Sequence, residues 1–221
     1  MTAHSGCPNP MSTITAIQAQ KKRGNRRSIF VDGRFVAGAH EQVVEALDLR
    51  VGQAFEPDRL VQILHAETAR KAYDAALRLI SYRDRSISEL RSRLVGNDFP
   101  EDIVEKVVEQ LREAGLLDDE KFSRDWVRSR STSRPMGRTR LAWELRSKGV
   151  AAAVVDEAVS AIDEDTEYQL ARSLIESKLQ RAGRADSSLR GRLGSFLRRR
   201  GFGWDVITKV TEELCPDKDT A

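Results

Sequence analysis

Apolar residues recur in the second half of the chain in a pattern that is repeated three times. Successive apolar positions in each repeat are separated by 4, 5, 4, 4 and 4 residues, and the repeats are displaced by 51 and then 52 residues. Offsets of 4 keep side chains on one face of a helix, so the pattern predicts amphipathic helices. The positions are Leu90, Leu94, Phe99, Ile103, Val107 and Leu111 in the first repeat, Leu141, Leu145, Val150, Val154, Ala158 and Ile162 in the second, and Leu193, Leu197, Phe202, Val206, Val210 and Leu214 in the third.

The step of 5 residues falls at the same place in every repeat, and we interpret it as a turn between two helices. Gly149 and Gly201 stand at this step in the second and third repeats, as expected where a left-handed residue ends a helix. The first repeat has Gly96 and Asn97 there, followed by Pro100 at the start of the next helix. A further amphipathic helix precedes each pair, near residues 73–82, 121–130 and 166–180. Each repeat is therefore predicted to be a three-helix bundle.

Residues 28–37 predict a β-hairpin ahead of the repeats. Two short apolar runs flank Asp32 and Gly33, which tolerate the positive φ angles that a two-residue type I′ turn requires. Residues 14–20 alternate loosely between apolar and polar, so we expect a small β-meander over about residues 14–37. A helix is predicted near residues 40–48, and a longer one from Pro57 toward Ile80.

The expected fold is all-α, with three tandem three-helix, helix-turn-helix-like repeats in an elongated curved array and a small N-terminal β-hairpin extension. Repeats stacked on their neighbours stabilise bundles whose own cores are thin. The expected boundaries are a disordered leader at 1–13, the hairpin and helix extension at 14–56, the first repeat with a lead-in helix at 57–117, the second at 118–164, the third at 165–214 and a disordered tail at 215–221.

Composition agrees with thin helical cores and excludes several classes of protein. Of the 221 residues, 40% are hydrophobic, 32% charged and only 6% aromatic, which suits wide solvated faces and not a deep substrate pocket. No apolar run approaches the roughly 20 residues of a membrane helix, and the N-terminal segment has no apolar core typical of a secretory signal. Cys7 and Cys215 lie in polar terminal segments, so a reducing cytoplasm is the expected location.

Positive charge is segregated along the chain. The segment from Lys121 to Lys148 contains nine basic residues and only two acidic ones. The segment from Arg172 to Arg200 contains the same numbers. Such segregation is typical of a surface that binds nucleic acid, although solvated faces that keep a thin-cored protein soluble have the same composition. The candidate contacts with DNA phosphates or with an acidic protein surface are Arg124, Arg128, Arg130, Arg134, Arg138, Arg140, Lys148, Arg190, Arg192, Arg198, Arg199 and Arg200.

Motifs of catalysis, metal binding and nucleotide binding are absent from the sequence. The three histidines are scattered, and neither an H-E-x-x-H motif nor a P-loop occurs. Asp118 and Asp119 resemble a Mg²⁺ site, but N-capping of the following helix explains both. Trp126 and Trp143 lie among arginines and suit stacking on bases, although we expect them in the repeat core. We therefore expect a protein that is not an enzyme and holds no cofactor or metal.

Three motifs occur in order along the first two repeats. Residues 83–94 read R-D-R-S-I-S-E-L-R-S-R-L, residues 115–119 read G-L-L-D-D, and residues 144–149 read E-L-R-S-K-G. In sequence and spacing these motifs resemble the RecX family of recombination regulators, over about residues 72–214. The third repeat departs from the pattern, because residues 193–197 lack the Glu-Leu pair of the other two repeats.

The resemblance implies a function that the residue pattern alone does not supply. It implies a negative regulator of RecA that binds the RecA–single-stranded DNA filament and inhibits its ATP hydrolysis, strand exchange and growth during recombination, DNA repair and the SOS response. The implied partners are the RecA filament and single-stranded DNA, with duplex DNA as a further candidate, bound weakly and without sequence preference. Neither a membrane nor a second copy of the chain is expected.

Two other functions fit the residue pattern. Each repeat has about the size of a helix-turn-helix module, so the chain suits a sequence-independent helical DNA- or RNA-binding protein with no recombinase partner. A passive helical scaffold is the third reading, and it predicts no effect on any activity of the filament.

Overall fold

The computed structural model describes residues 12–20, 23–182 and 189–215. Residues 1–11 of the expected leader and 216–221 of the expected tail lie outside the described residues. Ser12 and Thr13, also expected in the leader, are instead held by the chain: the Ser12 carbonyl accepts a hydrogen bond from the Phe55 backbone N–H, and Thr13 forms a β-bridge with Ala54.

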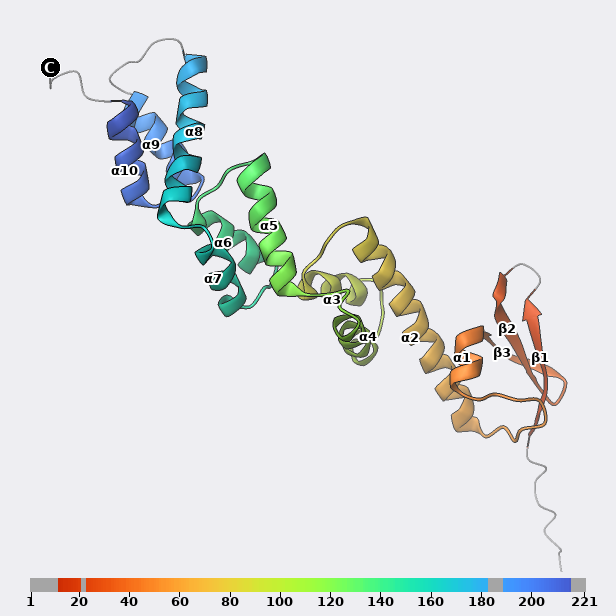
Figure 1. Ribbon diagram of the computed structural model, residues 1–221. Helices are drawn as coiled ribbons and strands as arrows, with labels where there is room; N and C mark the ends of the chain where they lie inside the picture. The colour runs from red at the N-terminus through yellow and green to blue at the C-terminus, as the bar shows by residue number, and fades with distance from the viewer. Residues whose placement is uncertain (1–11, 21–22, 183–188, 216–221) are drawn as a thin grey trace, which may run out of the picture. The chain divides into compact units, whose positions relative to one another are not determined.

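Most described residues lie in helices, as predicted, and a small antiparallel sheet precedes them (Figure 1). The strands are β1 (Ile14–Gln20), β2 (Arg23–Val31) and β3 (Arg34–His40). The helices are α1 (Glu41–Ala46), α2 (Pro57–Tyr82), α3 (Ile87–Val95), α4 (Glu101–Glu113), α5 (Asp119–Ser133), α6 (Arg138–Ser147), α7 (Ala152–Ser160), α8 (Glu164–Ala182), α9 (Leu189–Arg199) and α10 (Trp204–Leu214). The chain forms two compact units, Met1–Ser81 with Arg93–Glu109, and Tyr82–Ser92 with Gln110–Ala221.

The first unit contains the sheet, whose strand order β1-β2-β3 is the predicted meander. Asp32 and Gly33 have φ angles of 49° and 78°, so the predicted hairpin turn is confirmed. Alternate residues of the strands, among them the fully buried Ile14 and Ile29, form a small core with Val43 of α1 and Ile63 of α2.

A buried carboxylate joins the sheet to α2. Glu67 of α2 is only 4% exposed, and its Oε2 accepts a hydrogen bond of 2.7 Å from the His40 backbone N–H at the end of β3. Its other oxygen accepts from the guanidinium of Arg26 on β2. A buried carboxylate is tolerated only when it is paired and hydrogen bonded, and both conditions hold for Glu67.

The step of 5 residues is a helix-ending hydrogen bond in all three repeats. The backbone N–H at the end of the step donates to the carbonyl five residues earlier, with N···O distances of 3.3 Å for Phe99–Leu94 and 3.2 Å for both Val150–Leu145 and Phe202–Leu197. Gly149 and Gly201 are left-handed, with φ angles of 75° and 80°, as predicted. The prediction for the first repeat was wrong, because Asp98, with a φ of 62°, takes the left-handed conformation in place of Gly96 or Asn97. Aspartate tolerates this conformation better than most residues.

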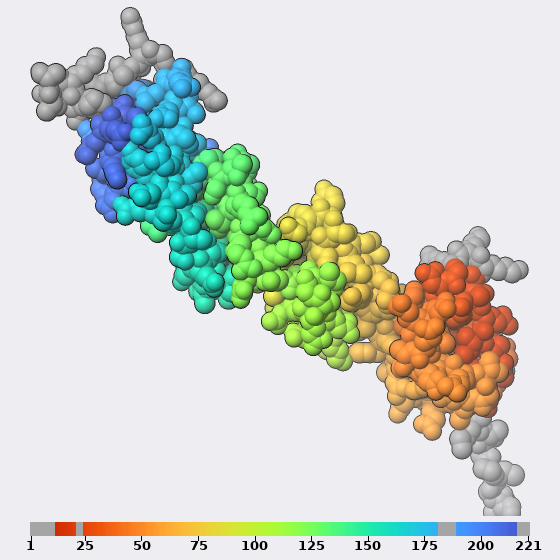
Figure 2. Space-filling model, viewed as in Figure 1, coloured from red at the N-terminus to blue at the C-terminus, as the bar shows by residue number. Residues whose placement is uncertain are grey.

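The second and third repeats each enclose a core of their own within the second unit. Leu141, Leu145 and Val155 are fully buried in the second repeat, and Ala171, Ile175, Leu197 and Val210 in the third. Val154, expected in the core, is only partly buried, because Val155 is the residue of α7 that points inward. Figure 2 shows α8, in cyan, and α10, in dark blue, lying against each other in the third repeat.

Replacing Leu145 with alanine removes the side chain at the centre of the second repeat. Large-to-small changes in a packed core lose transfer free energy and leave a cavity, so we expect Leu145→Ala to lower the free energy of unfolding by about 2–5 kcal/mol. Thermal unfolding followed by circular dichroism measures the change. Leu116→Ala, at a leucine that is 50% exposed, is the matched control. Equal melting temperatures for the two variants would contradict the assigned core.

Candidate nucleic-acid interface

Successive repeats contact each other within the second unit through a donor and a backbone carbonyl at equivalent positions of the repeat. The Ser86 hydroxyl, at the N-terminus of α3, donates to the Lys148 carbonyl at 2.5 Å. The Gly137 backbone N–H, at the N-terminus of α6, donates to the Arg200 carbonyl at 3.0 Å. Ser86 and Gly137 are 51 residues apart and Lys148 and Arg200 are 52 apart, which are the displacements of the sequence repeat. We call these two contacts the first and second repeat seams.

A carboxylate from the following repeat caps the helix at each seam. Asp119 Oδ1 accepts a 2.9 Å hydrogen bond from the Ile87 backbone N–H, and Glu167 Oε1 accepts one of the same length from the Arg138 backbone N–H. Both donors are the first residues of their helices, where backbone N–H groups lack partners in the helix itself. Asp118 caps its own helix as predicted, through the N–H groups of residues 120 and 121, and Asp119 lies in the first turn of that helix as predicted. The hydrogen bond of Asp119 to a helix of the preceding repeat was not predicted.

Glycine is required at both seams for space as well as for φ. A Cβ on Gly149 would lie 2.2 Å from the Ser88 hydroxyl oxygen, and a Cβ on Gly201 would lie 2.4 Å from the Arg140 backbone nitrogen. The collision at Gly201 is with backbone atoms, which cannot move aside as a flexible side chain does. These glycines lie in the turns that the step of 5 residues predicted, but their part in bringing adjacent repeats together was not predicted from the sequence.

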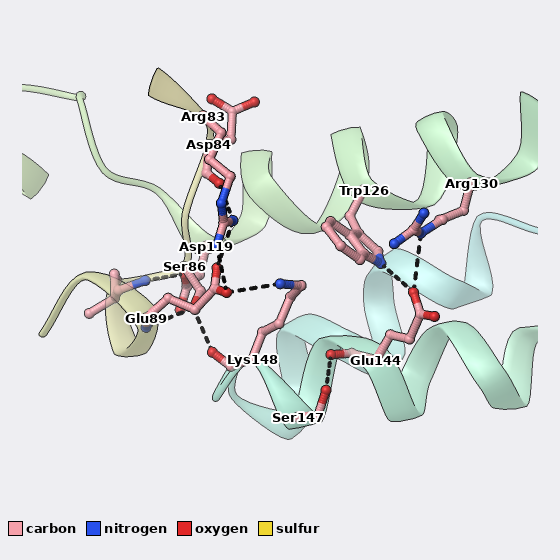
Figure 3. Close-up of polar contacts among 11 residues, drawn as sticks. Arg83, Asp84, Ser86, Glu89, Asp119, Trp126, Arg130, Glu144, Ser147 and Lys148 are labelled. Carbon is pink, nitrogen blue, oxygen red and sulfur yellow. Dashed lines mark hydrogen bonds and ion pairs between the residues drawn. The ribbon is translucent and has the colours of Figure 1, made fainter. Parts of the chain in front are cut away.

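The first seam also contains an ion pair (Figure 3). Lys148 Nζ lies 2.9 Å from Glu89 Oε1, and the Arg83 guanidinium contacts the same carboxylate at 3.2 Å. The Lys148 ammonium also lies 4.4 Å from the centre of the Trp126 ring, in a cation–π contact. Burial would raise the pKa of the Glu89 carboxyl, but hydrogen bonds from Arg83 and Lys148 outweigh it and hold that pKa below its usual value.

At the second seam, arginines surround a cavity of about 270 Å³ that we call the arginine hollow. Its lining residues are Arg134, Met136, Arg140, Glu144, Phe196, Arg199 and Arg200. The Arg200 guanidinium donates to the Pro135 carbonyl at 2.9 Å and lies 5.1 Å from the centre of the Phe196 ring. Burial in this position lowers the pKa of Arg200, and the positive charge of Arg134 lowers it further.

The single carboxylate of the arginine hollow is already engaged. Glu144 Oε2 accepts hydrogen bonds from the Trp126 indole N–H at 3.1 Å and from Arg130 Nε at 3.2 Å, as Figure 3 shows. Its other oxygen lies 3.6 Å from Arg140 Nε. The four arginines that line the hollow therefore outnumber the available negative charge, which makes the hollow attractive to an anion.

The two tryptophans of the second repeat differ in exposure. Trp126 packs against the core as predicted, whereas the core position expected for Trp143 was wrong, because its side chain is 55% exposed. Arg140, one helical turn earlier on α6, stacks on the Trp143 indole with its guanidinium carbon 4.3 Å from the ring centre. An exposed indole thus lies beside an arginine of the hollow.

The structure brings together only part of the predicted basic set. Arg134, Arg140, Arg199 and Arg200 line the hollow, and Arg130 adjoins it through Glu144. The remaining residues lie elsewhere in the second unit: Lys148 pairs with Glu89 and Arg138 with Glu167 at the seams, Arg124 and Arg128 pair with Glu120 and Asp125 along α5, Arg190 pairs with Glu212, and Arg192 and Arg198 lie on α9.

In the described part of the chain, no cluster of three or more His, Cys, Asp or Glu side chains is placed to hold a metal ion. In the same residues, no helix combines the length and apolar character needed to cross a membrane.

Family models match the chain in four consecutive parts. The RecX N-terminal domain matches residues 12–56, and the first, second and third three-helix domains of RecX match residues 72–111, 118–159 and 165–211. A regulatory protein RecX of Clostridioides difficile is 29% identical over 205 residues, which cover 92% of this chain and 96% of that protein. One of Bacillus velezensis is 28% identical over 210 residues, covering 95% and 80%.

Solved structures agree in fold. A crystal structure of a regulatory protein RecX has a TM-score of 0.79 and 26% sequence identity, and the match covers 91% of this chain and 99% of that one. A crystal structure of RecX from Lactobacillus salivarius has a TM-score of 0.62 and 22% identity, covering 67% and 97%.

Gly201→Ala tests the second repeat seam. The new methyl group would collide with the backbone of α6, and residue 201 has a φ of 80°, which is unfavourable for alanine. We therefore expect the variant to lose at least about 2 kcal/mol in free energy of unfolding. Gly191→Ala, in α9 with open space around its Cβ, is the control and should be stabilised by up to about 1 kcal/mol. Denaturant unfolding compares them; a Gly201→Ala protein as stable as wild type would refute the close approach.

Glu89→Gln tests the ion pair of the first seam through its pH dependence. Because the folded-state pKa of Glu89 is lowered, its ionised form stabilises the fold above the usual glutamate value of 4.5, and the contribution is lost as the pH falls through the lower folded-state pKa. The free energy of unfolding of the wild type should exceed that of Glu89→Gln by about 1–2 kcal/mol at pH 7, and this difference should shrink below pH 4.5. Thermal melts across this range decide the matter, with the exposed Glu157→Gln as control. A difference that is independent of pH would exclude the pair.

Proposed function

The chain belongs to the RecX family, and on this premise we propose that it is a negative regulator of RecA. It binds the RecA–single-stranded DNA filament and inhibits ATP hydrolysis, strand exchange and filament growth during recombination and DNA repair. The observation that carries the proposal is the match of four RecX domains, in order, to residues 12–56, 72–111, 118–159 and 165–211. The cytoplasm, where RecA acts, is the location that goes with this function.

The surface chemistry of the second unit supports a partner with negative charge. Arg134, Arg199 and Arg124 are exposed, and the arginine hollow has more positive charge than its own glutamate neutralises. Contacts of this kind position a protein on a phosphate backbone without reading its sequence, as a regulator that acts on any filament requires. In this proposal the regulator acts by binding and not by catalysis, which is supported by the roles of the carboxylates at its seams and hollow as helix caps and ion-pair partners.

RecA-dependent ATP hydrolysis on single-stranded DNA tests the function. The protein is titrated into RecA of the same organism at physiological salt, with DNA in excess so that competition for free DNA does not lower the rate. We expect hydrolysis to fall at a sub-stoichiometric ratio, because one regulator bound to a filament affects many RecA subunits. No change up to molar excess, with the protein folded by circular dichroism, would contradict the proposal.

Salt dependence separates this function from that of a sequence-independent DNA- or RNA-binding protein. Binding through phosphates alone weakens with salt, with a log–log slope of about 0.7 per phosphate on single strands. Inhibition led by contacts with RecA should persist at salt concentrations that abolish binding of the protein to DNA alone. If inhibition and DNA binding disappear together, the protein acts on DNA and not on the filament.

A further inference from the structure

We propose that the arginine hollow binds a backbone phosphate of single-stranded DNA, and that the exposed Trp143 indole stacks on the adjoining base. The proposal deepens the function above, since it names the component of the filament that this surface contacts. It concerns binding of DNA by the chain itself, so it can fail while inhibition of RecA stands.

The two seams carry different charges at equivalent positions. The repeat displacement places Arg140 at the position of Glu89, and Arg200 at the position of Lys148. The first seam therefore pairs a carboxylate with an ammonium at 2.9 Å, whereas two guanidinium groups occupy the equivalent positions of the second. At the position of Glu89 the second seam has a positive charge in place of a negative one, so an anion from outside would complete the second seam.

The hollow contains more positive than negative charge. Glu144 is shared among Arg130, Arg140 and the indole of Trp126. Within the described residues, no carboxylate pairs with Arg134 or Arg199. Arg200 is half-buried, and its pKa is lowered by burial and by Arg134, so the cluster is electrostatically unfavourable as it stands. A bound anion would relieve this repulsion and gain charge-assisted hydrogen bonds.

The chemistry of the groups around the hollow favours nucleic acid over an acidic protein surface as the partner. Guanidinium groups bind phosphate oxygens in a bidentate manner, and four of them exceed what one side-chain carboxylate neutralises. Sites for single-stranded nucleic acid combine such positive grooves with aromatic side chains on which bases stack. Trp143 supplies that aromatic surface, since it is 55% exposed and lies against Arg140 of the hollow. The combination of clustered guanidinium groups with an exposed indole is the one typical of single-stranded nucleic-acid sites.

Arg140→Glu is the decisive variant, because it places a carboxylate where the first seam has Glu89. The new group lies among Arg134, Arg199 and Arg200 and occupies the hollow in place of the phosphate. Arg199→Glu is the second variant, at an exposed arginine whose replacement costs no ion pair within the described residues. Arg146→Glu lies on α6 like Arg140, but outside the hollow and outside the predicted basic set, and it makes the same change in net charge, so it is the matched control.

Fluorescence anisotropy of a labelled oligothymidylate of about 20 nucleotides measures binding without RecA. We expect Arg140→Glu and Arg199→Glu to weaken binding at least about tenfold and to reduce the salt slope by about 0.7, while Arg146→Glu changes affinity by less than about threefold. Binding should also quench tryptophan fluorescence of the wild type, and Trp143→Phe should lose that quenching. Melting curves of each variant verify that it is folded.

The remaining outcomes overturn the proposal in distinguishable ways. Equal weakening by all three charge reversals would mean a diffuse electrostatic effect with no site. If the hollow variants bind the oligonucleotide normally but no longer inhibit RecA ATP hydrolysis, the hollow receives a carboxylate of RecA and not a phosphate. If they bind and inhibit normally, the hollow has no part in either interaction, although inhibition of RecA by the wild type would still stand.

Discussion

The close approach of successive repeats at Gly149 and Gly201 is the constraint on which the second unit depends. Each glycine both ends a helix and leaves room for the neighbouring repeat, where a Cβ would lie within 2.4 Å of another atom. The approach brings a carboxylate, Asp119 or Glu167, to the N-terminus of a helix in the preceding repeat, where it satisfies a backbone donor. The close approach at the glycine and the hydrogen bond to the carboxylate therefore both determine how adjacent repeats align.

At both seams a donor at the start of one helix bonds to a carbonyl at equivalent positions of the repeat, and other side chains then make the seams chemically different. Glu89 and Lys148 neutralise each other at the first seam, and the contact is complete within the chain. Arg140 and Arg200 take the same positions at the second seam and leave positive charge around a cavity. A repeat protein can in this way keep one structural contact and convert a copy of it into a surface for binding.

Periodicity predicted the helices, the turn at the step of 5 residues and the left-handed glycines, because these depend on local spacing. It did not predict that Asp119 caps a helix of another repeat, since that hydrogen bond joins residues 32 positions apart. The exposure of Trp143 was also missed, because apolar character alone does not show on which side of α6 the indole lies. The two arginines of the second seam could have been found from the sequence, because aligning the repeats places Arg140 under Glu89 and Arg200 under Lys148.

We propose that the second seam, a positively charged copy of the first, receives the DNA of the recombinase filament. A cryo-electron microscopy map of the protein bound to RecA on single-stranded DNA tests it most directly. We expect density for a backbone phosphate between Arg140 and Arg200, with a base against Trp143. A map in which the arginine hollow faces solvent, or encloses a carboxylate of RecA, would contradict it.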